Sequence, residues 1–119
     1  MAQDRPTAAE LLAAIADLLR DEVIPVLDKA EPRLGFQMRV AANSLAILER
    51  EARQGPAADA REHERLVKLL GRDGSLDELN RELARQLRAG ARDEHDAALM
   101  THLEKTIADK IAIANPRWK

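Results

Sequence analysis

The sequence predicts an all-α fold: a compact bundle of about five helices that run mostly antiparallel within one domain, residues 1–119. Three observations support this prediction. Apolar residues recur at intervals of three and four over most of the chain, and no strand-like alternation interrupts them. The Ser/Thr-x-x-Glu segments at residues 7–10 and 75–78 have the form that marks a helix start. Gly and Pro residues separate the periodic segments, and 119 residues fit a single domain.

The first predicted helix begins at Thr7, because Thr7 and Glu10 have the spacing of a capping box. Pro25 removes a backbone donor and clashes with the preceding turn, so we expect a kink or a break near residues 22–24. The sequence leaves open whether Pro25 kinks one helix or splits it into two. Residues 28–33 are expected to connect this helix to the next one. The apolar stripe of the first helix comprises Leu11, Leu12, Ile15, Leu18, Leu19 and Val26.

The segment from Leu34 to Arg53 is predicted to be the central helix of the bundle. One stripe comprises Leu34, Met38, Ala41, Leu45, Leu48 and Ala52, and a second group comprises Phe36, Val40 and Ile47. The two groups lie on nearly opposite sides, and a helix that is apolar on two sides needs neighbours on both. We therefore expect the rest of the chain to enclose this helix. It should end at residues 54–56, Gln-Gly-Pro, where Gly suits a C-terminal cap and Pro suits the first turn of a new helix.

Three more helices are expected after Pro56. The third covers residues 57–70, and the fourth runs from the capping box at Ser75 to about Ala89. The fourth has one row of leucines at 76, 79, 83 and 87, a thin seam typical of a peripheral helix or of one completed by another chain. The fifth starts near Asp93 and ends at residues 115–116, Asn-Pro.

The composition limits the classes of partner. Nineteen Lys and Arg residues against twenty-one Asp and Glu give a net charge of −2 with interleaved signs, so no basic face predicts nucleic-acid binding. The chain has no cysteine, which excludes disulfides and thiolate metal sites. A polar N-terminus and the lack of a ~20-residue apolar run predict a soluble cytoplasmic protein with no membrane partner.

The titratable residues predict no catalytic, cofactor-binding or metal site. His95 and His102 are seven residues apart on one helix, ~10.5 Å along its axis, and cannot share one ion. His63 lies on the apolar side of its helix and is predicted to be a structural histidine, with Asp59 as a hydrogen-bond partner. The carboxylate pairs are interpreted as solvated ion pairs with basic residues four positions away.

Two polar groups are candidate ligand or partner contacts. Arg39, Asn43 and Arg50 project from one side of the central helix. Either Asn43 makes a structural hydrogen bond to a neighbouring loop, or the row binds a phosphate or carboxylate.

The second group is the C-terminal tail, with Asn115, Arg117 and Trp118. The single Trp follows a helix stop, where a solvated end has little use for it. Either it folds back to plug the bundle, or it docks on a partner as an aromatic anchor.

Three stretches carry a resemblance to a known group of proteins: residues 5–12 (RPTAAELL), 39–47 (RVAANSLAI) and 110–118 (KIAIANPRW). They resemble a family of small, all-helical bacterial proteins of unknown function. The genes of that family tend to neighbour those of an acyl-CoA dehydrogenase and an aminoglycoside-phosphotransferase-like kinase. The resemblance implies an accessory role beside enzymes that process acyl-CoA or phosphorylated hydroxyacyl intermediates, and it assigns no functional residue.

The sequence thus predicts a non-enzymatic helical accessory or protein-interaction module. Its partner is expected to be a second copy of the chain or the neighbouring kinase or dehydrogenase. The alternative is a small-ligand binding protein in which Arg39, Asn43 and Arg50 hold an acyl-CoA or phosphate-type anion.

Overall fold

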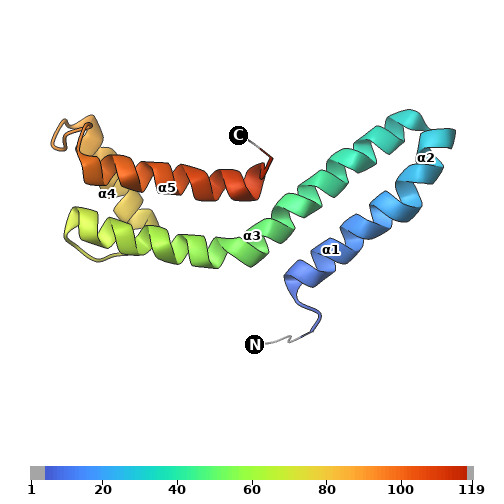
Figure 1. Cartoon of the computed structure of the whole chain (residues 1–119), viewed down its shortest axis with the longest axis horizontal. Coiled ribbons are helices and arrows are strands. Elements are labelled where there is room, and N and C mark those ends of the chain that lie inside the picture. Colours follow the sequence, from blue (N-terminus) through green and yellow to red (C-terminus); the bar gives the residue numbers. More distant parts are fainter. Residues whose placement is uncertain (1–4, 118–119) are drawn as a thin grey trace. The chain divides into compact units, whose positions relative to one another are not determined.

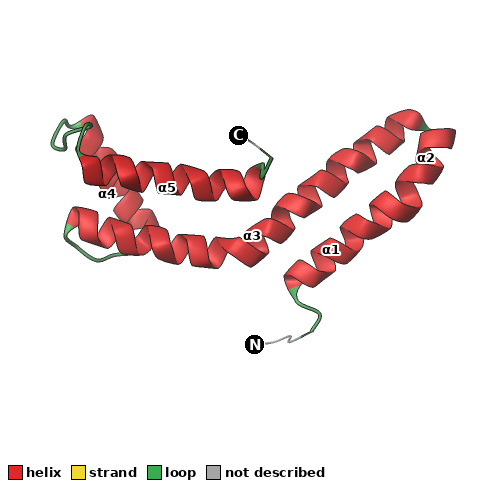
Figure 2. Cartoon of the chain, viewed as in Figure 1, coloured by secondary structure: helices red, strands yellow, loops and turns green. Residues whose placement is uncertain are grey.

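The computed structural model describes residues 5–117, and all of the regular secondary structure in this range is helical (Figures 1 and 2). The elements are α1 (Ala8–Leu18), the π-helix η1 (Leu19–Val23), α2 (Ile24–Ala30), α3 (Pro32–Leu70), α4 (Leu76–Arg88) and α5 (Ala97–Ala114). Because α1, η1 and α2 follow one another without interruption, the described residues contain four helical rods. The all-α class is confirmed, and the expected number of about five helices is slightly too high.

The irregularity expected at residues 22–24 is the π-helical turn η1. The Ile24 N–H donates to the Leu19 carbonyl, five residues earlier. Pro25 follows in the first turn of α2, where its missing N–H matters least. A π turn contains one residue more than an α turn, so the carbonyl that would clash with the proline ring is displaced. The helix therefore continues through Pro25.

The connector between the first two rods is shorter than expected. Residues 28–33 were predicted to form it, but α2 extends to Ala30 and α3 begins at Pro32, which leaves Glu31 alone between them. Pro32 favours this early start because its fixed backbone angle suits the first turn of a helix.

The prediction that the central helix ends at Gly55 and Pro56 is wrong. α3 runs through both residues and reaches Leu70, so the expected second and third helices are one. Pro56 removes one backbone hydrogen bond, at a cost of ~3 kcal/mol. The alanines and charged residues on both sides are good helix formers, and a helix that is already propagating needs no new nucleation.

The chain divides into two compact units, Met1–Gln54 (unit 1) and Gly55–Lys119 (unit 2). In unit 1, the rod of α1, η1 and α2 runs antiparallel beside the first half of α3 (Figure 1). Unit 2 contains the second half of α3 with α4 and α5. The organisation of the whole chain as one domain stays a prediction.

Small residues form the contact between the two rods of unit 1. Ala9 and Ala16 of α1 and Gly35 and Ala42 of α3 are buried, together with one larger side chain, Ile24 of α2. A Cβ on Gly35 would lie 2.4 Å from the Oδ1 atom of Asp28 and 3.3 Å from its backbone nitrogen. Glycine therefore allows α2 and α3 to approach closely. Apart from Ile24, the buried residues are alanines and a glycine, which bury little apolar surface, so this contact stabilises unit 1 less than a core of leucines would.

The expectation that residues 34–53 are enclosed on both sides is wrong for unit 1. Phe36, Val40 and Ile47 are 65%, 51% and 37% exposed. Unit 1 provides a single neighbouring rod, and that rod packs against Gly35 and Ala42 rather than against this stripe.

Unit 2 has a leucine core. Leu66 of α3, Leu79 and Leu83 of α4, and Leu99 of α5 form one buried cluster. Half-buried Val67, Leu69, Leu70, Leu76 and Leu103 surround it. The thin leucine seam of the fourth predicted helix is therefore completed mainly by α3 and α5 of its own chain.

Both predicted capping boxes are confirmed. The Thr7 hydroxyl accepts from the Glu10 N–H, and the Ser75 hydroxyl accepts from the Glu78 N–H. Hydrogen bonds from the Thr7 backbone and hydroxyl lower the pKa of Glu10, and those from the Ser75 hydroxyl and backbone lower the pKa of Glu78. These caps fix the starts of α1 and α4.

Candidate functional site

Unit 1 has two sides of different chemistry, because successive residues of an α-helix turn by about 100°. Ala16 and Ala42 are buried between the two rods, and helical geometry then places Ile15 and Leu48 on one side of the pair. Arg20 and Arg39 point to the other side, where they line a common groove. The two antiparallel rods of unit 1 form a helical hairpin. This hairpin therefore has apolar side chains on one side and charged side chains on the other.

The first side, the apolar face, carries no charged residue along the hairpin. Its members follow helical spacing on both rods: Leu11, Leu12, Ile15, Leu19, Val23 and Leu27, then Leu34, Ala41, Leu45, Leu48 and Ala52. Ile15 is 47% exposed and Leu48 is 52% exposed. An exposed apolar surface that spans two helices is typical of an interaction site.

The second side, the polar groove, holds part of the predicted anion-binding row. It measures about 450 Å³ and is lined by Arg20, Ile24, Pro25, Asp28, Arg39, Ala42 and Asn43. Arg39 forms an ion pair with Asp28, and an Arg20 Nη2–H donates to the Ala42 carbonyl over 3.4 Å. An anion in this groove would compete with the Asp28 carboxylate for Arg39.

The structure places the three residues of the row in different surroundings. Arg39 and Asn43 share the polar groove, and both are exposed. Arg50 is half-buried and does not line this groove. Asn43 lies at the surface of the hairpin rather than against a loop.

Two of the three predicted tail contacts lie within the described residues. Asn115 caps the C-terminus of α5, and its N–H donates to the Ile111 carbonyl over 2.7 Å. Asn115 also borders a shallow, mainly apolar groove of about 310 Å³ with Ile107, Lys110, Ile111 and Ala114. Arg117 is exposed. Trp118 lies outside the described residues, so both predictions for it stay open.

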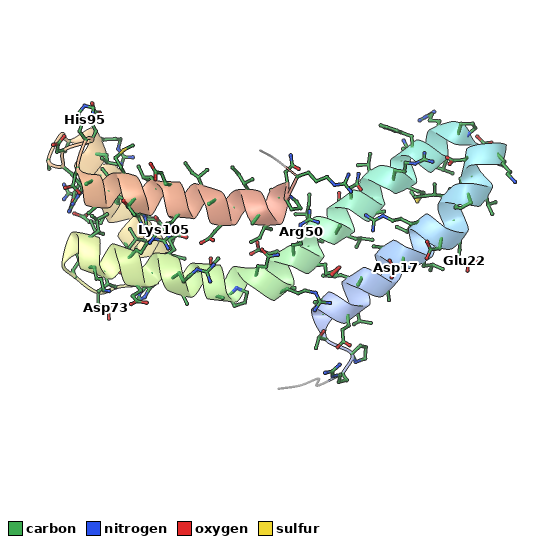
Figure 3. The ribbon with its side chains drawn as sticks, viewed as in Figure 1. Asp17, Glu22, Arg50, Asp73, His95 and Lys105 are labelled. Atoms are coloured by element: carbon green, nitrogen blue, oxygen red, sulfur yellow. The ribbon has the colours of Figure 1, made fainter. Side chains whose placement is uncertain are left out.

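His63 makes the contacts of a structural histidine, but its partner is not Asp59. Its Nε2 atom lies 2.8 Å from the Gly74 carbonyl oxygen and 3.4 Å from an Asp73 carboxylate oxygen. The turn after α3 brings both groups to the ring. Figure 3 shows Asp73 in this turn, and His95 at the surface beyond α4.

His102 is a buried polar residue that the sequence analysis missed. Its side chain on α5 is 3% exposed, and the Arg65 Nε–H donates to its Nδ1 atom over 3.1 Å. Because Nδ1 accepts, a neutral ring carries its proton on Nε2. Burial and then the charge of Arg65 lower the pKa of His102. The apolar spacing of Leu99 and Leu103 could have indicated burial, but nothing local identifies Arg65 as the partner.

Three cations of unit 2 line a second feature that the sequence did not predict. This cationic pocket measures about 420 Å³ and is lined by Arg65, Lys68, Leu69, Arg92, Asp96, Ala98 and His102. The residues come from the end of α3, the loop before α5 and the start of α5. Periodicity cannot reveal such a cluster, since its members are far apart in the sequence.

Two kinds of feature are absent from the described residues. Between residues 5 and 117, no group of three His, Asp or Glu side chains could hold a metal ion. Across the same range, no helix combines the length and apolar character needed to cross a membrane.

The comparisons with known proteins place the chain in a family. Residues 28–118 match DUF6285, a domain of unknown function. The chain belongs to this family. The match extends from the end of α2 through α5, and the searches of curated proteins and of solved structures gave no match. The description of DUF6285 assigns no activity, so a function has to be argued from the surfaces of the two units.

Proposed function

We propose that this DUF6285 protein is a non-enzymatic helical interaction module whose apolar face in unit 1 pairs with a second copy of the chain. The apolar face is the observation that supports this proposal most directly. It extends along both rods of unit 1, contains no charged residue, and leaves Ile15 and Leu48 about half exposed. A helix pair with one such side gains stability when a second layer covers it.

The size of the apolar face suits a dimer. About 20 residues in each rod give a length of ~30 Å, and two rods at ~10 Å spacing give a width of ~20 Å. The face therefore offers ~600 Å² per copy and ~1,200 Å² in a pair, the lower end of specific protein interfaces. Because the face is free of charge, a two-fold arrangement of identical copies brings no like charges together.

The stripe of Phe36, Val40 and Ile47 is a weaker candidate for the same role. These side chains are also exposed, but they belong to α3 alone and point away from the other rod of unit 1. A stripe one helix wide offers about half the area of the apolar face. This difference provides a matched control.

Light scattering coupled to size exclusion tests the pairing. We expect the full chain to be a dimer at about 100 μM, and Leu48→Glu to shift it to monomer, since a buried unpaired carboxylate costs several kcal/mol. Val40→Glu places the same charge on the same helix at a side chain of nearly equal exposure, 51% against 52%. It should leave the dimer intact.

Two results would contradict the proposal. One is a wild-type chain that stays monomeric up to about 200 μM. The other is equal dissociation by Leu48→Glu and Val40→Glu, with both variants fully helical by circular dichroism, because the interface would then not be the apolar face.

The family resemblance of the sequence also supports a second kind of partner, a different protein. An accessory role beside an acyl-CoA dehydrogenase or an aminoglycoside-phosphotransferase-like kinase predicts co-purification with one of these enzymes. We also propose a cytoplasmic location, which suits a chain without cysteine. Co-expression with each enzyme, followed by capture of the tagged DUF6285 chain, measures the association, and capture of neither enzyme would count against this role.

Binding of a small anion in the polar groove is the second candidate function. Arg39 and Asn43 lie together there, as an acyl-CoA or phosphate-type ligand would require. The ion pair of Arg39 with Asp28 makes this candidate weaker than the interaction module. A thermal-shift panel of acyl-CoA and phosphate compounds tests it, and Arg39→Gln should abolish any stabilisation that arises in this groove.

A further inference from the structure

We propose that the cationic pocket of unit 2 binds a small phosphate-bearing molecule through the guanidinium groups of Arg65 and Arg92. The site belongs to unit 2 alone. It therefore does not depend on the pairing of apolar faces in unit 1, and the two proposals can fail separately.

Neutral partners hold Arg65 in place. Its Nε–H donates to His102 Nδ1 over 3.1 Å, and an Nη2–H donates to the Thr106 hydroxyl over 3.0 Å. His102 is buried and has a lowered pKa, which keeps its ring uncharged near neutral pH. These two bonds fix the orientation of the guanidinium without balancing its charge.

Arg92 is held in the same manner. Its Nε–H donates to the Gln86 side-chain oxygen over 2.9 Å, and an Nη2–H donates to the Leu69 carbonyl over 3.0 Å. Like Arg65, this side chain is half-buried. Within residues 5–117, neither arginine has a carboxylate within 4.0 Å, so each keeps donors and a positive charge for a ligand.

The other charged lining residues leave the pocket positive. Asp96 is the single carboxylate in the lining, and its Oδ2 atom accepts the Leu99 N–H over 2.9 Å as the cap of α5. Lys68 lies 3.5 Å from Glu64, which does not line this pocket. Three cations and one carboxylate give the lining a charge of about +2, which suits a phosphate monoester dianion.

The volume agrees with this ligand class. A pocket of about 420 Å³ lies near the lower end of the range for small-molecule sites. Arginine presents its donors in a planar fork that matches the oxygens of a phosphate group. A phosphorylated metabolite of modest size is thus favoured over a long polyanion.

A neighbouring groove shows why the cationic pocket is the better candidate. That groove measures about 450 Å³ and also contains Arg65 and Lys68, with Arg61, Glu64, Lys105, Ala108 and Asp109. Figure 3 shows Lys105 on α5, on the side of α3. Arg61 is paired there with Asp109 over 3.2 Å. Its four cations and two carboxylates give the same lining charge of about +2, but a phosphate in this groove would meet two carboxylates, Glu64 and Asp109, instead of one.

Titration of the full chain with inorganic phosphate, followed by NMR at constant ionic strength, tests the site. We expect saturable shifts of the Arg65 and Arg92 Nε–H signals, with a dissociation constant in the millimolar range for the bare ion. Arg92→Gln should weaken binding about tenfold or more, which corresponds to ~1.4 kcal/mol. Arg92→Lys keeps the charge without the fork and should weaken binding by a smaller factor.

Arg81→Gln is the matched control, because Arg81 is 77% exposed on α4 and pairs with Asp77. It should bind phosphate as the wild type does. The proposal is overturned if the wild-type chain shows no saturable shift up to about 20 mM phosphate. It is equally overturned if Arg81→Gln weakens binding as much as Arg92→Gln, since the attraction would then be diffuse. Thermal melts confirm that each variant is folded during the titration.

Discussion

At the scale of single residues, His102 links the packing of unit 2 to its charge. The ring is buried on α5 and accepts a hydrogen bond from Arg65, so protonation would place two cations side by side in a poorly hydrated site. Glu62 acts in the opposite direction and raises the pKa of His102, but burial and Arg65 outweigh it.

The lowered pKa predicts a loss of stability in mild acid. An unfolded histidine takes up a proton as the pH falls through about 6.5, whereas folded His102 does so only at lower pH. The unfolded state therefore binds more protons in this interval. The melting temperature should fall as the pH is lowered from about 7.5 to about 5.5.

Replacement of His102 isolates its share of this effect. His102→Asn keeps an oxygen that can accept from Arg65, and it should flatten the fall in melting temperature while lowering the melting temperature at pH about 7.5. His95→Asn, at an exposed histidine, is the control and should keep the wild-type profile. A profile of His102→Asn parallel to that of the wild type would show that another group titrates.

The sequence could identify some of these residues but not their partners. The spacing of His63 to nearby apolar residues correctly indicated a structural role, yet Asp73 and Gly74 contact it rather than Asp59. Arg65 and His102 are 37 positions apart, so only the fold brings them together. Local patterns indicate which side chains lie on one helix face, and they do not say which other segment covers that face.

At the scale of elements, the two interior prolines are accommodated differently. Pro25 follows the π turn η1, which displaces the carbonyl that its ring would strike. Pro56 lies inside α3, where the Ala52 carbonyl loses its usual donor. The cost to helix stability should therefore be larger at Pro56.

Substitution of the two prolines by alanine tests this difference. Pro56→Ala restores a donor within α3 and should raise the free energy of unfolding by about 1–3 kcal/mol. Pro25→Ala should change it by less than about 1 kcal/mol, because the π turn already relieves the clash. Chemical denaturation measures both values. A destabilised Pro56→Ala variant would indicate that α3 needs an irregular turn at this position.

Sequence patterns predicted helix starts better than helix ends. Both capping boxes mark the starts of α1 and α4, because hydroxyl and carboxylate groups three residues apart satisfy backbone donors locally. Gly55 and Pro56 are compatible with a helix end and also with a continuous helix. The helix-forming residues on both sides favour the continuous helix. The Gly-Pro pair alone therefore did not determine whether the helix ends there.

At the scale of the whole molecule, the buried residues of the two units contribute different amounts of stability. Leu66, Leu79 and Leu99 are fully buried in unit 2, whereas alanines and Gly35 supply much of the contact in unit 1. Each leucine buries several times the apolar area of an alanine, so unit 2 gains more stability from its own side chains. Unit 1 gains more from any surface that covers its apolar face.

Hydrogen exchange at two protein concentrations tests this contrast. Amides around Leu66, Leu79 and Leu99 should exchange slowly at both about 5 μM and about 200 μM. Amides of α1 and of α3 in unit 1 should exchange several-fold more slowly at the higher concentration, because pairing stabilises this unit by mass action. Protection of unit 1 that does not depend on concentration would contradict the dimer.

Periodicity predicted the fold class but not the enclosure of residues 34–53. The two apolar stripes of that segment are real, and the segment is helical as expected. A stripe indicates that burial is favourable, and it leaves open whether the same chain or another chain provides it. Phe36 and Val40 illustrate this limit, since both are more than half exposed in the structure.

The single connecting residue Glu31 constrains how this protein can vary. With one residue between α2 and α3, the register of the hairpin is set by the turn itself. An inserted residue would advance α3 by ~1.5 Å and rotate it by about 100°. Leu34 and Leu48 would then leave the side they share with Ile15, and Gly35 would no longer meet Asp28. Length changes are therefore tolerated better in the longer loop between α4 and α5 than at this tight link.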